Sequence, residues 1–428
     1  MTGSSEQMLR LDTATALRRF WHLERALLLA CGGWVPCVRR LETKAALAEV
    51  AWESSLIAES LRRRVFELRY PDRALDREPD AQLIDLFEVV ANAPDAHAFL
   101  SAIADQVLPS LAAAYDRYLK VSDEVADGPS FRILNQGRED KQRHRSLLRS
   151  AVDSEERSSA GDNWVRAFTL DLKTLGGIPV EAPATAAPPG DPGTPHRIPD
   201  APARDERYLN GLFYWPDNFD PNYPYGEGKR LQLRTAISHL NEVWAVETAG
   251  AILFDLGPQL GWDFITDAAR WLYDESRHMT MGRTRLERWG FAPGELPLGS
   301  FIYGSCAGKG PLYRLGMLAF FETKNIGKKA ERAVTFGKLG DRSGQRDMEF
   351  DWADEAIHAG YGRRWLREAM GIEGRAGDDW PEFVRECEAL VGQHIAEASD
   401  EDRSIIRSRA TALIETAEHH PIPANGGS

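Results

Sequence analysis

Residues 274–278 read DESRH and residues 354–358 read DEAIH, two copies of the pattern Asp-Glu-x-x-His. On an α-helix, residues three positions apart share one face, so each copy directs a carboxylate and an imidazole to the same point. A carboxylate and an imidazole on one helix face are a common pair of metal ligands. Two such copies in one chain predict two helices that contribute to a single metal site.

Each motif is preceded by one further Glu at the distance expected for a neighbouring helix. Glu247 lies 28 residues before Glu275, and Glu322 lies 33 residues before Glu355. All four segments carry these residues on apolar stripes with helical spacing, which predicts that they face a core. A charged group there costs several kcal/mol unless it is paired or bound to a cation. The four carboxylates therefore predict a shared metal centre.

Two alternatives bear on this interpretation. The six residues could be partly buried carboxylates and core histidines with ordinary partners, which is the simpler explanation for any one of them alone. Glu242 is also a rival to Glu247. The two are five residues apart, about 140° around a helix, so both cannot face the metals. Glu247 lies on the more apolar stripe, and we expect it to be the ligand.

The ordered set Glu, Glu-x-x-His, Glu, Glu-x-x-His resembles the ferritin-like di-iron carboxylate superfamily, which includes ribonucleotide reductase small subunits, bacterial multicomponent monooxygenases and ferritins. Residues 274–278 are similar to the Asp-Glu-x-Arg-His of the monooxygenase hydroxylases. Residues 354–365 (DEAIHAGYGRRW) more closely resemble an uncharacterised bacterial branch of ferritin-like proteins. The resemblance covers about residues 235–370 and implies an all-α fold containing a four-helix bundle.

The resemblance also implies a role for each matching residue. Two carboxylates would bridge the metals at the catalytic centre, two would be terminal ligands, and each histidine would bind one metal. The aspartate of each motif would accept the N–H of a ligand imidazole, although it could equally be a solvated residue, and the arginine would pair with these carboxylates. The bridging carboxylates are Glu275 and Glu355, the terminal ligands are Glu247 and Glu322, and the histidines are His278 and His358. The aspartates are Asp274 and Asp354, and the arginine is Arg277.

The function that follows is a non-haem oxidase or monooxygenase, an oxidoreductase that uses two Fe ions, or a Mn/Fe pair, and O₂ to oxidise a small molecule. Hydroxylation, desaturation and N-oxygenation all remain open. Such an enzyme needs an electron donor, either a reductase or a ferredoxin, and we allow for a homodimer. Trp271, Tyr273 and Tyr361 are candidates for the cavity or the electron path, or are simply core residues. Ferroxidase-type iron handling and a scaffold with a stabilising metal are the alternative functions.

Composition favours a cytoplasmic protein. The net charge of −13 over 428 residues disfavours nucleic acid or an anionic membrane as the main partner. The longest uncharged apolar run, residues 26–38, is too short to cross a bilayer. No signal peptide is visible, and the four cysteines form no Cys-x-x-Cys pair.

Four regions are expected along the chain: a metal-free ferritin-like bundle (1–155), a Pro/Ala-rich linker or strap (156–206), the di-metal bundle (207–375), and C-terminal helices with a tail (376–428). The two C-terminal helices are expected at about 381–397 and 400–419, and the tail from Pro421 is expected to be disordered. The aromatic segment 208–225 is expected to form an ordered loop.

The N-terminal region carries a damaged version of the metal-binding pattern. Glu24 and Glu53 are 29 residues apart, but Leu56 stands where the first histidine would be. Lys141 and His144 have the spacing of the second motif with Lys in place of Glu, and Leu108 replaces the other Glu. We therefore expect a duplicated bundle without metal. Lys141 would pair with Glu24 and Glu53, or extend to solvent.

Overall fold

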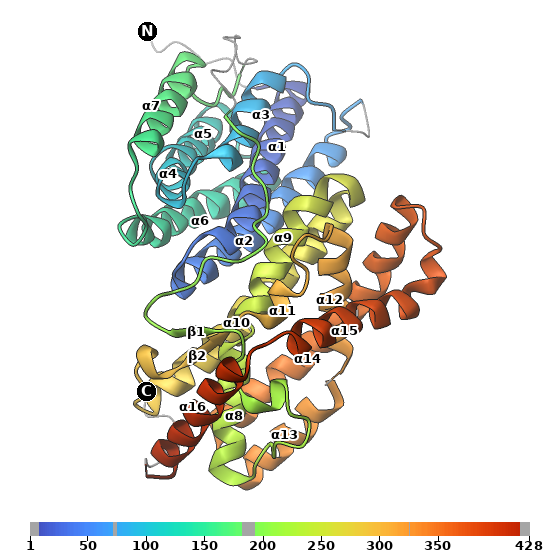
Figure 1. The fold of residues 1–428 in the computed structure, drawn as a ribbon. Helices are drawn as coiled ribbons and strands as arrows, with labels where there is room; N and C mark the ends of the chain where they lie inside the picture. Colours follow the sequence, from blue (N-terminus) through green and yellow to red (C-terminus); the bar gives the residue numbers. More distant parts are fainter. Residues whose placement is uncertain (1–7, 72–74, 182–192, 325, 420–428) are drawn as a thin grey trace. The chain divides into compact units, whose positions relative to one another are not determined.

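The computed structural model describes residues 8–71, 75–181, 193–324 and 326–419. Within these ranges the chain is mostly helical, which confirms the all-α prediction, and it divides into two compact units (Figure 1). Unit 1 comprises Met1–Trp34 and Ala46–Arg197, and unit 2 comprises Val35–Ala45 and Ile198–Ser428. All four cysteines are free thiols.

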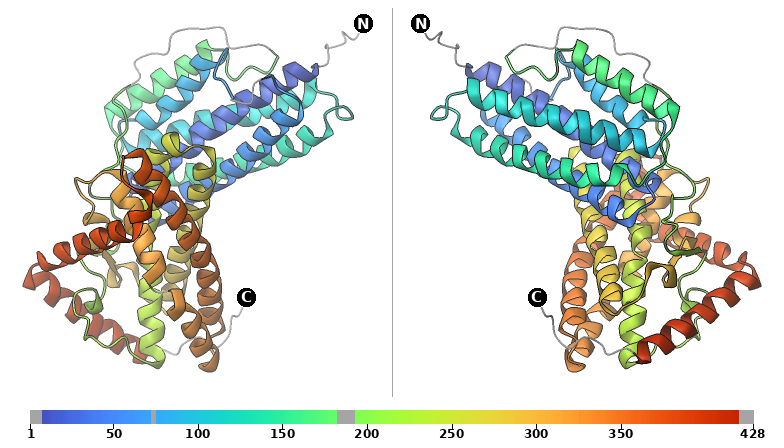
Figure 2. Two further views of the ribbon diagram at one scale, coloured as in Figure 1. Left: turned by 90° about the vertical axis from the view of Figure 1, so that its right-hand side faces the viewer. Right: turned by 90° about the vertical axis from the view of Figure 1, so that its left-hand side faces the viewer.

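Unit 1 is built from long helices that lie side by side, drawn in blue to green in Figure 2. They bury apolar faces against one another, with Phe20, Leu61 and Leu134 fully buried. The helices are α1 (Arg10–Trp34), α2 (Leu41–Glu67), α3 (Ala81–Glu88), α4 (Ala96–Ala102), α5 (Leu108–Val121), α6 (Gly128–Val152) and α7 (Ser159–Thr174). The first residues of α2, 41–45, belong to unit 2.

The last of these helices departs from the predicted linker over residues 156–206. Ser158 begins α7 by accepting a 2.9 Å hydrogen bond from the backbone N–H of Gly161, the usual device of an N-cap. Phe168 and Leu172 are buried, and α7 packs against α4. The helix therefore belongs to unit 1. Residues 193–206 contain no helix or strand, and residues 182–192 lie outside the described ranges.

One stretch of unit 1, Ala96–Val121, is long and apolar enough by composition to cross a membrane. It comprises α4, a π-helical turn (Ile103–Val107) and α5, and 61% of its most apolar window is buried inside the protein. A buried core helix of a soluble protein has these same properties, and Tyr115 and Tyr118 of α5 are completely buried.

Unit 2 holds the segments that carry both motifs. Its elements are β1 (Leu209–Gly211), α8 (Gly228–Leu240), α9 (Val243–Leu260), α10 (Trp262–Arg288), β2 (Pro297–Gly299), α11 (Phe301–Gly304), α12 (Pro311–Lys324), α13 (Ile326–Lys338), α14 (Arg342–Ile372), α15 (Trp380–Ala396) and α16 (Asp400–His419). The two short strands pair in parallel, with Leu209 opposite Pro297.

Four helices of this unit, α9, α10, α12 and α14, pack on one another, while α8 packs on α10 and α13 on α14. The sequence of α10 explains its orientation, because its buried residues recur at alternating steps of four and three from Phe264 to Gly282. Gly282 is required at its position. A Cβ there would lie 2.1 Å from the backbone nitrogen of Leu240, so α8 and α10 cross at backbone contact.

Outside these helices, two predictions about local structure are confirmed. The helices predicted at about 381–397 and 400–419 are α15 and α16, which pack on α12 and α8 respectively. In the aromatic segment, Tyr208, Phe213, Tyr214 and Trp215 are buried around β1 and a short 3₁₀ turn (Pro216–Asn218). The predicted tail from Pro421 lies outside the described residues.

Candidate metal centre

Seven acidic and imidazole side chains of unit 2, six on α10, α12 and α14 and one in the turn before α9, meet in two groups. The ligand-type atoms within each group lie within 4.8 Å of one another. One group is Glu242, His278, Asp351 and Glu355, and the other is Glu275, Glu322, Glu355 and His358. Glu355 belongs to both, so the groups are adjacent. Six of the seven residues are no more than 5% exposed, and the side chain of Glu242 is 14% exposed.

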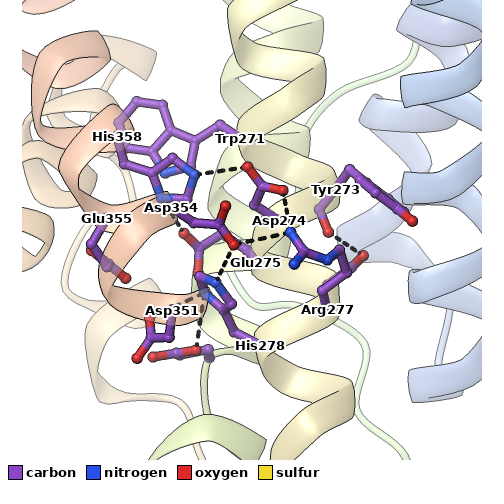
Figure 3. A network of polar contacts seen from close by, with 12 residues as sticks. Trp271, Tyr273, Asp274, Glu275, Arg277, His278, Asp351, Asp354, Glu355 and His358 are labelled. Carbon is purple, nitrogen blue, oxygen red and sulfur yellow. Dashed lines mark hydrogen bonds and ion pairs between the residues drawn. The ribbon is translucent and has the colours of Figure 1, made fainter. Parts of the chain in front are cut away.

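Both imidazoles present Nδ1 to these carboxylates (Figure 3). His358 Nδ1 lies 3.0 Å from Oε1 of Glu275, and His278 Nδ1 lies 3.5 Å from carboxylate oxygens of Glu275 and Glu242. Within the described part of the chain, neither Nδ1 has a hydrogen-bond partner. Two completely buried nitrogens therefore point, without a donor or acceptor of proper geometry, into a cluster of oxygens. This arrangement suits the ligands of a cation.

The other nitrogen of each ring contacts the aspartate of the opposite motif. Nε2 of His278 lies 3.2 Å from Asp354, and Nε2 of His358 lies 3.4 Å from Asp274. Arg277 Nη1 lies 2.6 Å from Asp274 and 2.9 Å from Asp354, so one guanidinium joins both aspartates. The predicted Asp–His and Arg–Asp contacts are present, and they tie α10 to α14. When the neutral ring donates Nε2–H to a carboxylate, Nδ1 keeps its lone pair.

The pKa values reflect an excess of buried negative charge. Burial raises the pKa of Glu355 well above its ordinary value, and the neighbouring charge of Glu322 raises it further. Burial likewise raises the pKa of Glu242 to about 8. Burial alone would lower the pKa of His278, but the charge of Asp351 and contacts with Asp354 and Glu275 hold it well above 6.5. A cation at the cluster would relieve this repulsion.

Glu247 does not lie in either group, and the choice of Glu247 over Glu242 is reversed. Glu247 is completely buried and pairs with Lys44, 3.0 Å away and equally buried, and with Arg204. The physical reason is that almost every residue of α9 from Val243 to Leu253 is buried. Glu242 lies in the turn before α9, so the helical phase of α9 does not apply to it, and Glu247 lies on a helix that has no single core-facing stripe.

Asp351 is a residue of the site that the sequence prediction did not include. The nearest apolar residue before Glu355 on the same stripe is Trp352, but Trp352 is 46% exposed, whereas Asp351 is completely buried. The spacing could have revealed it. Asp351 lies four residues before Glu355 and seven before His358, which places all three on one helix face.

Aromatic rings close one side of the centre. Trp271 donates from its indole N–H to Glu322 at 3.2 Å, and its ring lies 5.5 Å from that of His358. The ring of Tyr361 lies 6.3 Å from His358. Tyr273 is placed differently, with the guanidinium of Arg277 over its ring at 5.9 Å.

The corresponding residues of unit 1 are held by protein cations. Lys141 Nζ lies 2.7 Å from Glu24, with both side chains completely buried, and Tyr115 donates to the same carboxylate at 2.5 Å. The predicted pairing of Lys141 with Glu24 is therefore confirmed. Its pairing with Glu53 is wrong, because Glu53 contacts His144, at 2.6 Å, and Arg143.

Two further positions of unit 1 bear on the proposed duplication. Leu108 is buried in α5, whereas Leu56, expected at a core position, is 46% exposed. Among the described residues, both groups that could hold a metal lie in unit 2.

Comparison with known families adds one fact to this geometry. The chain belongs to the family described as Protein of unknown function (DUF455). Its family model matches residues 184–410, just over half of the chain, and this range contains both motifs and all seven residues of the two groups. A search of curated proteins finds no match. A search of solved structures finds none either.

Proposed function

We propose that unit 2 is a ferritin-like four-helix bundle whose centre binds two metal ions, and that the protein is a non-haem oxidase or oxygenase acting on a small molecule with O₂. The observation that carries this proposal is the pair of buried Nδ1 atoms that make no hydrogen bond and lie among five carboxylates. Carboxylate and imidazole donors suit Fe(II) or Mn(II), either as two Fe ions or as a Mn/Fe pair.

The donor set fits two divalent ions. Each group of the candidate centre supplies three carboxylates and one imidazole, with Glu355 available to bridge them. Five carboxylates facing one another in a buried site are unfavourable without cations, and two divalent ions would offset four of the five charges. Three or four protein ligands per ion leave positions open for O₂ and substrate.

Two such ions, when bound, would supply the electrons and the open positions that O₂ chemistry requires. The chain's own residues prepare the site. Asp274 and Asp354 hold the proton on Nε2 of the two histidines, which fixes the rings and makes Nδ1 a stronger donor. Trp271 keeps water away from one side of His358 and positions Glu322. Arg277 holds the two aspartates together.

The test is metal analysis and anomalous scattering on protein purified from iron-supplemented cells. Two metal positions per chain, roughly 3.5–4 Å apart, are expected. A chain that binds one metal or none contradicts the dinuclear centre, and binding of many ions would favour ferroxidase-type iron handling. Two ions with no reaction with O₂ would favour a scaffold with a stabilising metal.

A further inference from the structure

Lys329, in the first turn of α13, reaches the candidate centre from a helix that supplies none of its carboxylates. Its Nζ lies 2.6 Å from Oε1 of Glu355, 2.7 Å from Oδ1 of Asp351 and 3.7 Å from Oε1 of Glu242. The side chain is only 12% exposed. An ammonium at these distances forms charge-assisted contacts with two carboxylates and lies near a third.

These contacts coincide with one metal position and not with the other. Glu242, Asp351 and Glu355 are three of the four residues of the first group, whose fourth member is His278. The second group shares only Glu355 with them. The ammonium therefore uses the oxygens that a metal in the first group would need and leaves most of the second group untouched.

An ammonium and a divalent ion cannot share these oxygens. A small hard cation binds carboxylate oxygens at roughly 2 Å. A metal bound to Asp351 and Glu355 would lie within a few ångströms of Nζ, where the repulsion between their charges is strong in a buried site. The flexible four-carbon stem of a lysine lets the ammonium withdraw without moving the helix.

Resting on the dinuclear centre proposed above, we propose that Lys329 competes with the metal for the position formed by Glu242, His278 and Asp351. The two positions then fill in order. The first ion binds Glu275, Glu322, Glu355 and His358, and the second binds only when Lys329 has withdrawn. Before the second ion arrives, the ammonium offsets part of the charge of the five carboxylates.

The experiment is a titration with Mn²⁺ of the full chain and its Lys329→Met variant, followed by calorimetry and by electron paramagnetic resonance. An exchange-coupled spectrum replaces that of isolated Mn²⁺ only when the second position fills. In the wild-type protein the second ion should bind about tenfold or more weakly than the first. In Lys329→Met the dissociation constant of the second ion should fall by about tenfold or more, with little change at the first.

Lys328→Met is the matched control, because Lys328 is the adjacent lysine of α13 and is exposed. It should behave like the wild type. Lys329→Met protein that folds only when Mn²⁺ is present would support the inference, since the metal would then replace the lost ammonium.

Two results would overturn the inference. The first is that the wild-type protein binds both ions with equal affinity. The second is that the second ion binds no more tightly to Lys329→Met than to the wild type. In either case the dinuclear centre itself would stand. If no Mn²⁺ binds to any of the three proteins, the proposed centre fails and the inference fails with it.

Discussion

Nε2 of His278, on α10, lies 3.2 Å from Oδ2 of Asp354, on α14. The aspartate that orients this histidine therefore comes from the opposite motif, and the reciprocal contact joins His358 to Asp274. In each motif the aspartate and the histidine are four residues apart, so both project from the same side of their helix toward the partner helix. The two copies of Asp-Glu-x-x-His form one interlocked unit.

Asp354→Asn should weaken metal binding without abolishing it. An amide can retain the contact with His278, but it removes the negative charge that makes the imidazole a stronger donor. Changes of this kind typically cost roughly 10–100-fold in metal affinity. Calorimetric titration with Mn²⁺ measures the effect.

Asp263→Asn is the control for that variant, because Asp263 lies on α10 with its side chain 70% exposed. It should bind metal like the wild type. An unchanged affinity in Asp354→Asn would show that the contact with His278 does not tune the ligand.

Glu242→Gln and Glu247→Gln should have different consequences. Glu242→Gln should lower the affinity for the second metal ion, because Glu242 belongs to the first group of ligands. Glu247→Gln should leave metal binding intact and lower the free energy of unfolding by roughly 3 kcal/mol, because Lys44 and Arg204 lose a buried counter-charge. Metal titration and denaturant unfolding separate the two effects.

The opposite result would contradict the assignment of Glu242 to the site. If Glu247→Gln lost metal and Glu242→Gln kept it, the choice made from sequence would be right and the assignment from the structure would be wrong.

Lys141→Met should destabilise unit 1 and leave the metal content of the protein unchanged. The substitution leaves Glu24 completely buried without its cation, which costs roughly 3–5 kcal/mol. The double variant with Glu24→Gln should recover part of that loss, since no charge is then left unpaired. Denaturant unfolding with metal analysis tests both variants. A single variant as stable as the wild type would mean that the Glu24–Lys141 pair contributes no stability.

His22 should make unit 1 sensitive to acid. Burial lowers the pKa of His22 to about 4, while its Nε2 lies 2.9 Å from the backbone oxygen of Asp76. The unfolded chain takes up the proton near pH 6.5 and the folded chain only near pH 4. The contribution of His22 to the free energy of unfolding is therefore fully present above pH 6.5. It falls by about 3 kcal/mol as the pH drops toward 4.

The comparison with His22→Gln isolates that effect, because the acid sensitivity of all other groups is common to both proteins. Unfolding free energies at pH 7 and pH 4 should differ less in the variant than in the wild type. If the free energy of unfolding changed by the same amount between pH 7 and pH 4 in both proteins, a contribution from His22 would be excluded.

Much of unit 2 could be predicted because α10 and α14 are amphipathic. Their buried positions recur with helical spacing, so the motif residues could be assigned to one face of each helix. The sequence of α7 carries a similar signal, since Trp164, Phe168, Leu172 and Leu175 recur at steps of four and three, but the predicted linker joined these residues to the Pro/Ala-rich stretch that follows. The helix is stabilised by its N-cap at Ser158 and by packing on α4, which only the folded unit reveals.

The site could be predicted where the motif spacing places a carboxylate and a histidine on one face of an amphipathic helix. Glu275, His278, Glu355 and His358 lie on such helices and were assigned together. Glu247 lies on α9, which is covered on all sides, and Glu242 lies in the turn before it, so only the contacts of Glu247 with Lys44 and Arg204 decide between them. Lys329 reaches the centre from α13, and no spacing in the sequence indicates that contact.

The most direct test of the central claim is the reaction of the ferrous protein with O₂. Anaerobic protein loaded with two equivalents of Fe(II) is mixed rapidly with O₂, beside a His358→Ala variant and free iron in the same buffer. The wild type should react faster than both and show a transient visible absorption that neither of the others gives. Oxidation no faster than that of free iron would contradict an O₂-activating centre.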